Sequence, residues 1–453
     1  MNKQLDSISR QRHWQKLLRA CCLLLVASTA QAQLALPALP LPATPNPRLP
    51  VGAVHGAVNE LTQLDSIIVD AASEVNSQSQ NLLRAARVQK LLREHRDTLE
   101  ADANGAPVLR SQVLLLSPSS QSLRIATAAG FIAVQDQTMD GLDLRVMTLQ
   151  APAGMSARRA LQRLRRLDPT GNYDYNHVYT QSAAATVPAA SAGEARPRSF
   201  PNTRVGLIDS GVEVTHQVFR NNHVYTWGCD QQVMPSMHGT AVASLLVGQS
   251  EHFNGAAPGA MLYVADVYCG QAVGGAMTRI AGALGWLAQQ QVPVINISLV
   301  GPDNALLKQS VAHLITRGYL IVAAVGNDGP AAPPLYPAAY PDVIGVTGVD
   351  AQGRVLVEAG RGKQVILAAP GSDMAAATLQ DKFINVRGTS FAAPLVAGLL
   401  AIHLDAPQLQ AANAARTELL NSARDVGAKG VDTTYGYGIV GEALRMTMPA
   451  ASN

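Results

Sequence analysis

The chain has 453 residues, 47% hydrophobic and 15% charged, which indicates a globular protein of two or three domains and excludes a disordered chain or a coiled coil. The formal net charge is +3, but residues 1–32 alone carry +4 and the remainder carries −1. The remainder therefore lacks the global basic charge of a nucleic-acid-binding protein, and we expect no nucleic-acid partner.

Residues 1–32 have the three parts of a secretory signal peptide. Basic residues end at Arg19, an apolar run covers 20–27, and small residues at 30–32 fit cleavage before Gln33. The alternative, a membrane anchor, requires about 18 apolar residues, more than this run provides. We therefore predict export to a periplasm or out of the cell, with no membrane span after signal cleavage.

Cysteine usage agrees with export but leaves two interpretations open. Cys21 and Cys22 belong to the predicted signal, so Cys229 and Cys269 are the two that remain. An oxidising compartment favours a disulfide between them, and the alternative is two buried free thiols.

Three segments follow the predicted signal. Prolines recur from Pro37 to Pro50 and predict an extended linker over 33–60, and 61–104 is helix-permissive and predicts a helical hairpin. Residues 105–180 read as strand, helix, strand, strand, helix, strand, which is typical of a small ferredoxin-like α+β domain. The expected strands are near 113–116, 131–134, 142–149 and 173–179, and the expected helices are 119–129 and 156–167.

Five arginines cover one face of the second helix of this small domain: Arg158, Arg159, Arg163, Arg165 and Arg166. Such a run is usually a solvated face. The functional alternative is a docking surface for an acidic partner, because residues 200–447 carry a net charge of −3.

Residues 181–199 are rich in Ala, Ser and Pro without periodicity and predict a linker. In 200–447, short apolar runs alternate with helical segments, which predicts an α/β domain with a parallel sheet covered by helices on both faces. The expected strands are 205–208, 261–267, 292–297, 320–325, 343–346 and 365–369, and the expected helices are 238–248, 277–289, 306–317 and 390–403.

Four polar residues lie where such a sheet presents functional groups. Asp209 and Asn327 each follow an apolar strand, and His238 opens a helix in His-Gly-Thr. Ser390 follows Gly-Thr at the start of an apolar helix in which Pro394 fits the first turn. Each alone has a structural alternative, such as a turn or a helix cap. Together they supply what acyl transfer needs: a nucleophile, a base, a carboxylate that orients the base, and an oxyanion donor.

With Asp-Ser-Gly, His-Gly-Thr, Gly-Asn and Gly-Thr-Ser in this order, residues 200–446 resemble the subtilisin-like serine proteases, the subtilase family. The resemblance implies that Ser390 is the nucleophile and His238 the general base and acid. Asp209 would orient and stabilise His238, and the Asn327 side chain and the Ser390 backbone N–H would bind the oxyanion.

The resemblance also implies a substrate-binding edge where an extended peptide adds as a strand, formed by Ser298, Leu299, Val300 and Gly301. Tyr336-Pro337 resembles the neighbouring pocket wall, whose proline is typically cis. The chemistry requires no cofactor. We predict no metal site, because 249–259 is shorter than the calcium loop of familiar members, and whether structural calcium binds elsewhere stays open.

Family members are commonly made as zymogens with a ferredoxin-like pro-domain that assists folding and leaves its tail in the active site. By this resemblance 105–180 is the chain's own chaperone and inhibitor, docked through the arginine face, and self-cleavage falls within 181–199. We therefore predict an exported serine endopeptidase that acts on polypeptides. The alternatives are an esterase or amidase with the same triad, and a non-catalytic secreted binding module. Asp328 either selects a basic substrate residue or points to solvent.

Overall fold

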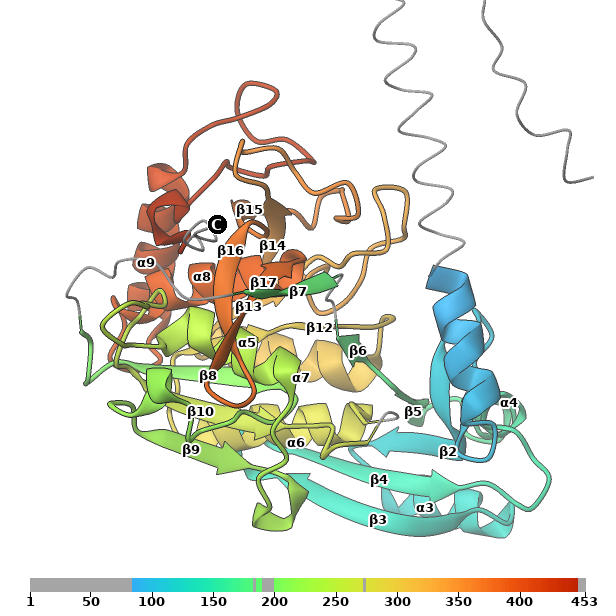
Figure 1. Cartoon of the computed structure of the whole chain (residues 1–453). Coiled ribbons are helices and arrows are strands. Elements are labelled where there is room, and N and C mark those ends of the chain that lie inside the picture. Colours follow the sequence, from blue (N-terminus) through green and yellow to red (C-terminus); the bar gives the residue numbers. More distant parts are fainter. Residues whose placement is uncertain (1–83, 182–184, 190–198, 272–273, 447–453) are drawn as a thin grey trace, which may run out of the picture. The chain divides into compact units, whose positions relative to one another are not determined.

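The computed structural model describes residues 84–181, 185–189, 199–271 and 274–446 (Figure 1). The predicted signal peptide, the proline-rich linker and the first part of the 61–104 segment lie outside the described residues, as do parts of the 181–199 linker. All described residues belong to one compact unit, Ser66–Asn453. Within them, no helix has both the length and the hydropathy needed to cross a bilayer.

A seven-stranded parallel sheet with helices on both faces forms the main domain, residues 200–446, and confirms the predicted α/β fold (Figure 1). In spatial order the strands are β15 (Leu367–Pro370), β14 (Ile344–Val349), β13 (Leu320–Ala324), β11 (Val294–Ile297), β8 (Arg204–Asp209), β10 (Met261–Asp266) and β9 (Val224–Trp227). The helices are α5 (Met237–Val247), α6 (Met277–Gln289), α7 (Ala305–Thr316), α8 (Thr389–Ala401) and α9 (Leu409–Ser422).

The central strands are mostly apolar because both faces of the sheet are covered. In β13, Leu320 and Val322 pack in the core that contains α5 and α8, whereas Ile321 and Ala323 pack in the core that contains α6 and α7. Successive side chains of a strand point to opposite faces, so a strand buried on both sides has few polar residues. This is why the short apolar runs were readable in the sequence.

A ferredoxin-like α+β region, residues 99–177, precedes the main domain. Its elements are β1 (Leu99–Ala101), β2 (Pro107–Leu116), α3 (Ser120–Ala128), β3 (Ile132–Met139), the 3₁₀ turn η1 (Asp140–Leu142), β4 (Leu144–Gln150), α4 (Ala157–Leu167) and β5 (Asn172–His177). Antiparallel pairing gives the order β5-β2-β4-β3, which is the predicted topology. Strand β1 corrects the expectation that 61–104 is all helical: residues 84–94 are helical, but Leu99 pairs with β2 and is buried in the core.

The α+β region packs on the main domain through its sheet and not through its arginines. In β2, Val113 and Leu115 pack with α4, whereas Leu114 and Leu116 join the cluster that contains α6. In Figure 1 the sheet lies at lower right, with α6 over one face and α3 and α4 on the other. Of the five arginines, Arg163 is half-buried and the other four are exposed. The predicted arginine docking surface is therefore wrong, because helix α4 lies on the far side of the sheet.

The predicted 181–199 linker contains strand structure that its composition did not show. Strand β6 (Thr180–Gln181) pairs antiparallel with β12 (Leu299–Val300). Strand β7 (Ala185–Ala189) pairs antiparallel with β17 (Lys382–Arg387), which forms a hairpin with β16 (Met374–Thr378). Strands β6 and β7 are extended because two strands of the main domain offer them backbone hydrogen bonds, not because their own sequences have a strand pattern.

Candidate active site

A buried carboxylate and an imidazole lie together at the carboxyl edge of the sheet. Asp209 is the last residue of β8, and His238 is the second residue of α5. His238 Nδ1 donates to Asp209 Oδ1 at 2.8 Å, and the same oxygen accepts the Ser210 N–H at 2.6 Å. His238 Nε2 is buried and has no hydrogen-bond partner among the described residues. The carboxylate thus fixes the ring and leaves Nε2 available to accept a proton.

A glycine allows α5 to start this close to β8. A Cβ built on Gly239 would lie 2.2 Å from the carbonyl oxygen of Ser210, which no larger residue can accept. The Gly239 N–H donates instead to Ser210 Oγ at 3.1 Å. The His-Gly pair in the sequence is therefore a packing requirement that brings His238 against Asp209.

Ser390 is fully buried in the first turn of α8, after Gly388 with a φ of 139° that favours glycine. Its hydroxyl donates to the Ser298 carbonyl at 3.4 Å. Pro394 lies in the interior of α8, not in its first turn as predicted, and it cannot donate to the Ser390 carbonyl four residues earlier. Ser298 Oγ makes that hydrogen bond instead, at 3.1 Å, and in turn accepts one from Asn296 at 2.9 Å.

Asn327 lies in the loop after β13, beside the start of α8. Its side-chain oxygen accepts the Thr389 N–H at 3.1 Å, and Thr389 Oγ1 accepts the Gly326 N–H at 3.2 Å. The side chain of Asn327 thus accepts through its oxygen, and its amide nitrogen is a hydrogen-bond donor. The structure therefore brings the loop of Asn327 to the turn that carries Ser390.

The predicted substrate-binding edge, Ser298 to Gly301, is occupied by the chain itself. Leu299 lies opposite Gln181 and Val300 opposite Thr180 in the antiparallel pair of β12 and β6. Gln181 also donates through its side chain to Ser210 Oγ at 2.9 Å, one residue from Asp209. On its other side Gly301 pairs with Tyr336, which precedes the cis proline Pro337. A polypeptide strand thus already lies on this edge and reaches the Asp209–His238 pair.

Tyr179, just before β6, is a residue of this site that the sequence did not single out. Its side chain is buried over Gly301, and its hydroxyl donates to the Pro302 carbonyl at 2.6 Å. Its backbone N–H donates to Gly275, and its carbonyl accepts from Tyr268. Without a structure, an isolated tyrosine at the end of a predicted strand gave no signal of this role.

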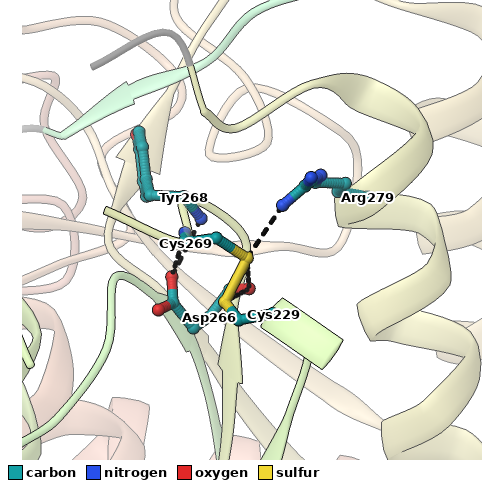
Figure 2. The surroundings of a disulfide bond; sticks show 5 residues. All are labelled: Cys229, Asp266, Tyr268, Cys269 and Arg279. Carbon is teal, nitrogen blue, oxygen red and sulfur yellow. Dashed lines mark hydrogen bonds between the residues drawn. A yellow bond between two sulfur atoms is a disulfide. The ribbon is translucent and has the colours of Figure 1, made fainter. Parts of the chain in front are cut away.

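Cys229 and Cys269 form a disulfide next to the site (Figure 2). Arg279 Nη1 lies 2.8 Å from Cys269 Sγ, and Asp266 Oδ1 accepts the N–H groups of Tyr268 and Cys269 (Figure 2). Burial raises the pKa of Asp266, against the lowering effect of these two N–H groups. The two sulfurs and Asp266 are close enough to hold a metal ion. Sulfurs joined in a disulfide are not thiolate ligands, however, and the cluster instead fixes the loop that carries Tyr268.

Comparison with known proteins identifies the family of the chain. The sequence profile described as "Subtilase family" matches residues 201–438. Subtilisin DY of Bacillus licheniformis is 28% identical over 57% of this chain and 97% of its own length. The major intracellular serine protease of Bacillus subtilis (strain 168) is 30% identical over 44% of this chain and 68% of its own length.

A similar fold occurs in the crystal structure of fervidolysin from Fervidobacterium pennivorans, described as a keratinolytic enzyme related to subtilisin. Its TM-score is 0.58 at 20% identity, covering 76% of this chain and 62% of that chain. The chain therefore belongs to the subtilase family. It is a subtilisin-like serine protease, a hydrolase whose substrates are polypeptides.

Proposed function

We propose that the chain is an exported serine endopeptidase made as a zymogen, with residues 99–181 as its pro-region. The observation that carries this proposal is the antiparallel pair of β6 with β12. The candidate substrate-binding edge holds the extended residues Thr180 and Gln181, and the Gln181 side chain donates to Ser210 Oγ next to Asp209. Backbone pairing of this kind tolerates many side chains, as an endopeptidase requires, and favours peptides over simple esters.

In the proposed mechanism Ser390 Oγ turns from the Ser298 carbonyl toward His238 Nε2, loses its proton there and attacks the peptide carbonyl carbon. His238 then gives the proton to the leaving amine, and Asp209 holds the imidazolium through Nδ1–H. The side-chain amide of Asn327 and the Ser390 N–H donate to the oxyanion. Water then attacks the acyl carbon while His238 takes its proton, and His238 returns that proton to Ser390 Oγ as the acid product leaves. No cofactor takes part.

The processing site is proposed to lie between Gln181 and Ala185. The two ends of this interval are held by different strands of the main domain, β12 and β17. Export rests on the sequence of residues 1–32 and on the disulfide, which is typical of oxidising compartments. The relatives do not decide the compartment, since one is named an extracellular protease and another an intracellular one.

The test compares the purified full chain with its Ser390→Ala variant. We expect wild type to react with a fluorophosphonate probe, to hydrolyse peptides and to show a new N-terminus after Gln181 in mass spectrometry. Ser390→Ala should lose labelling and processing, with turnover reduced about 10⁶-fold. Ser310→Ala, which removes another buried helix serine hydroxyl, is the matched control and should behave as wild type. Labelling or clipping that persists in Ser390→Ala would contradict the proposal.

A further inference from the structure

Glu358 and Arg387 form an ion pair in which the two side chains meet at two points. Arg387 Nη2 donates to Glu358 Oε2 at 2.8 Å, and Arg387 Nε lies 2.8 Å from Glu358 Oε1. The guanidinium fork thus faces both oxygens of the carboxylate, which is the most directional arrangement of such a pair. The Glu358 side chain is only 8% exposed. A carboxylate this buried is costly without a cation, so its position is tied to that of Arg387.

Arg387 is linked to the nucleophile by the chain itself. It is the last residue of β17, and two residues separate it from Ser390. The second of these is Thr389, whose N–H donates to the side-chain oxygen of Asn327 at 3.1 Å. A displacement of Arg387 would therefore reach both the turn that carries Ser390 and its contact with Asn327.

Glu358 is linked to the loop of Asn327 through the backbone. The Glu358 carbonyl accepts the Gly329 N–H at 2.8 Å. Two residues further on, the Gly360 N–H donates to the Gly326 carbonyl at 3.0 Å. The two hydrogen bonds flank Asn327 along the chain, one before it and one after it. The segment that carries Glu358 therefore supports the loop on both sides of this asparagine.

These contacts close a ring around the proposed oxyanion site. From Ser390 the ring passes through Thr389 to the loop of Asn327. The two backbone hydrogen bonds take it on to Glu358, and the ion pair takes it to Arg387 and back to Ser390. Opening the ring at the ion pair would weaken the support of the Asn327 loop. Catalytic groups tolerate little displacement, because a misplacement of about 1 Å can cost about 10²-fold in rate.

We propose that Glu358 and Arg387 are positioning residues for acyl transfer, and that their ion pair fixes the Asn327 amide relative to Ser390. This inference rests on the proposed mechanism, in which Asn327 donates to the oxyanion. The pair acts through Asn327 and not on the substrate. Because the oxyanion develops only on the way to the transition state, the pair should contribute to kcat and leave KM nearly unchanged.

The first test measures kcat and KM for the processed enzyme and for Arg387→Gln, Glu358→Gln and the double variant. We expect kcat to fall about 10- to 100-fold in each, with KM within about twofold. The double variant leaves no unpaired buried charge, so it decides the matter where a single variant folds poorly. An unchanged kcat, or a rise in KM alone, would overturn the proposal.

The matched control is Arg424→Gln. Arg424 faces both oxygens of Glu442 with the same fork, at 3.0 and 2.7 Å, but both side chains are exposed and neither belongs to the ring. This variant should change neither kcat nor KM. A similar loss of kcat in Arg424→Gln would show that removing any such pair slows the enzyme, and would remove the special role of Glu358 and Arg387.

The second test asks whether the ion pair acts through the Asn327 amide. Arg387→Gln is combined with Asn327→Ala, which removes that amide. Once the amide is absent, Arg387→Gln should cost less than about threefold, because residues that act as a unit are not additive. The full 10- to 100-fold loss in both backgrounds would show that Arg387 acts elsewhere and would refute the proposal.

A third test needs no hydrolysis and separates this inference from the function beneath it. In the Ser390→Ala chain, Arg387→Gln should speed hydrogen exchange of residues 326–329 and 388–391 about tenfold or more, and Arg424→Gln should not. If wild type cuts no peptide and reacts with no probe, the proposed function fails, and the exchange still decides whether the ion pair holds these two segments. Unchanged exchange would overturn the inference even in an active protease.

Discussion

The two sheets of this molecule bury their faces in different ways. The seven-stranded sheet is covered on both sides by helices of its own domain. The five-stranded sheet has α3 and α4 on one side only, and its other side, with Leu114, Leu116 and Val146, packs on α6 of the main domain. The main domain thus contains a complete core, whereas the α+β region completes its core only by docking. We expect the first to stay folded alone and the second to depend on its partner.

The largest expected effect on stability comes from removing the disulfide, which lies in the main domain and not in the α+β region. Cys229 and Cys269 are 40 residues apart, and closing such a loop stabilises a fold by about 4 kcal/mol in the chain-entropy model. The Cys229→Ser/Cys269→Ser variant, made in the Ser390→Ala chain, should lower the thermal midpoint of the main domain. A reductant should lower the parent and leave the variant unchanged. Equal midpoints would mean that the bridge adds nothing to the complete core.

The face of β2 that packs on the main domain gives the most direct test of whether the five-stranded sheet depends on docking. Leu114→Ala should cost about 2–5 kcal/mol, as much as Leu115→Ala on the helix-covered face, because both side chains are fully buried. In the Ser390→Ala chain, hydrogen exchange should rise in β2 to β5 for both variants, while β11 and β13 stay protected. If Leu114→Ala leaves exchange unchanged, the five-stranded sheet is stable without docking.

A smaller effect is expected at the polar rim of the same interface. Asp174 in β5 accepts the Ala305 N–H at 2.6 Å, at the N-terminus of α7, where the helix dipole favours a negative charge. Asp174→Ala should weaken the docked state by about 1 kcal/mol. The control Asp136→Ala, which breaks an exposed pair with Arg145, should change thermal unfolding by less. An equal effect of the two variants would show that the hydrogen bond of Asp174 to the N-terminus of α7 does not stabilise the docked state.

The smallest effect is a pH dependence within the α+β region. Burial would raise the pKa of Asp102, but hydrogen bonds from His177 and from the N–H groups of Ala106 and Asn104 outweigh it and hold this pKa below its ordinary value of 3.8. A depressed folded-state pKa stabilises the fold above that ordinary value, and the contribution is lost as pH falls through the folded pKa.

Thermal unfolding of the Ser390→Ala chain between pH 6 and pH 3 should therefore show an acid loss that Asp102→Asn reduces by up to about 1 kcal/mol. Identical pH profiles for the two proteins would show that this carboxyl has the same pKa folded and unfolded.

The sequence predicted well those elements whose pattern is local. Six strands of the main sheet, four of its helices and the ferredoxin-like order could be read because buried strands are continuous apolar runs and helices repeat every three to four residues. Strand β9 was not predicted, because Tyr225 and Thr226 are exposed at the edge of the sheet. Strands β6 and β7 were not predicted either, because their partners lie more than a hundred residues away.

The motifs also identified the Asp209–His238 pair and the segment beneath the bound strand, since each depends on residue types in a fixed order. The arginine surface failed because charge alone does not say which side of a sheet a helix covers. The ion pairs of Asp328 with Arg84 and Arg87 join residues more than two hundred positions apart in the chain, and no spacing rule connects them.

The separate anchoring of β6 and β7 has a consequence for the time course of activation. A cut between them breaks one bond but none of the backbone pairs that hold either new end. The freshly cut N-terminal piece therefore stays bound to the main domain and inhibits the enzyme that released it. Activity should follow cleavage only after an induction period, which is set by how fast that piece dissociates or is itself degraded. The first enzyme molecules to lose the piece should shorten this period for the remaining molecules.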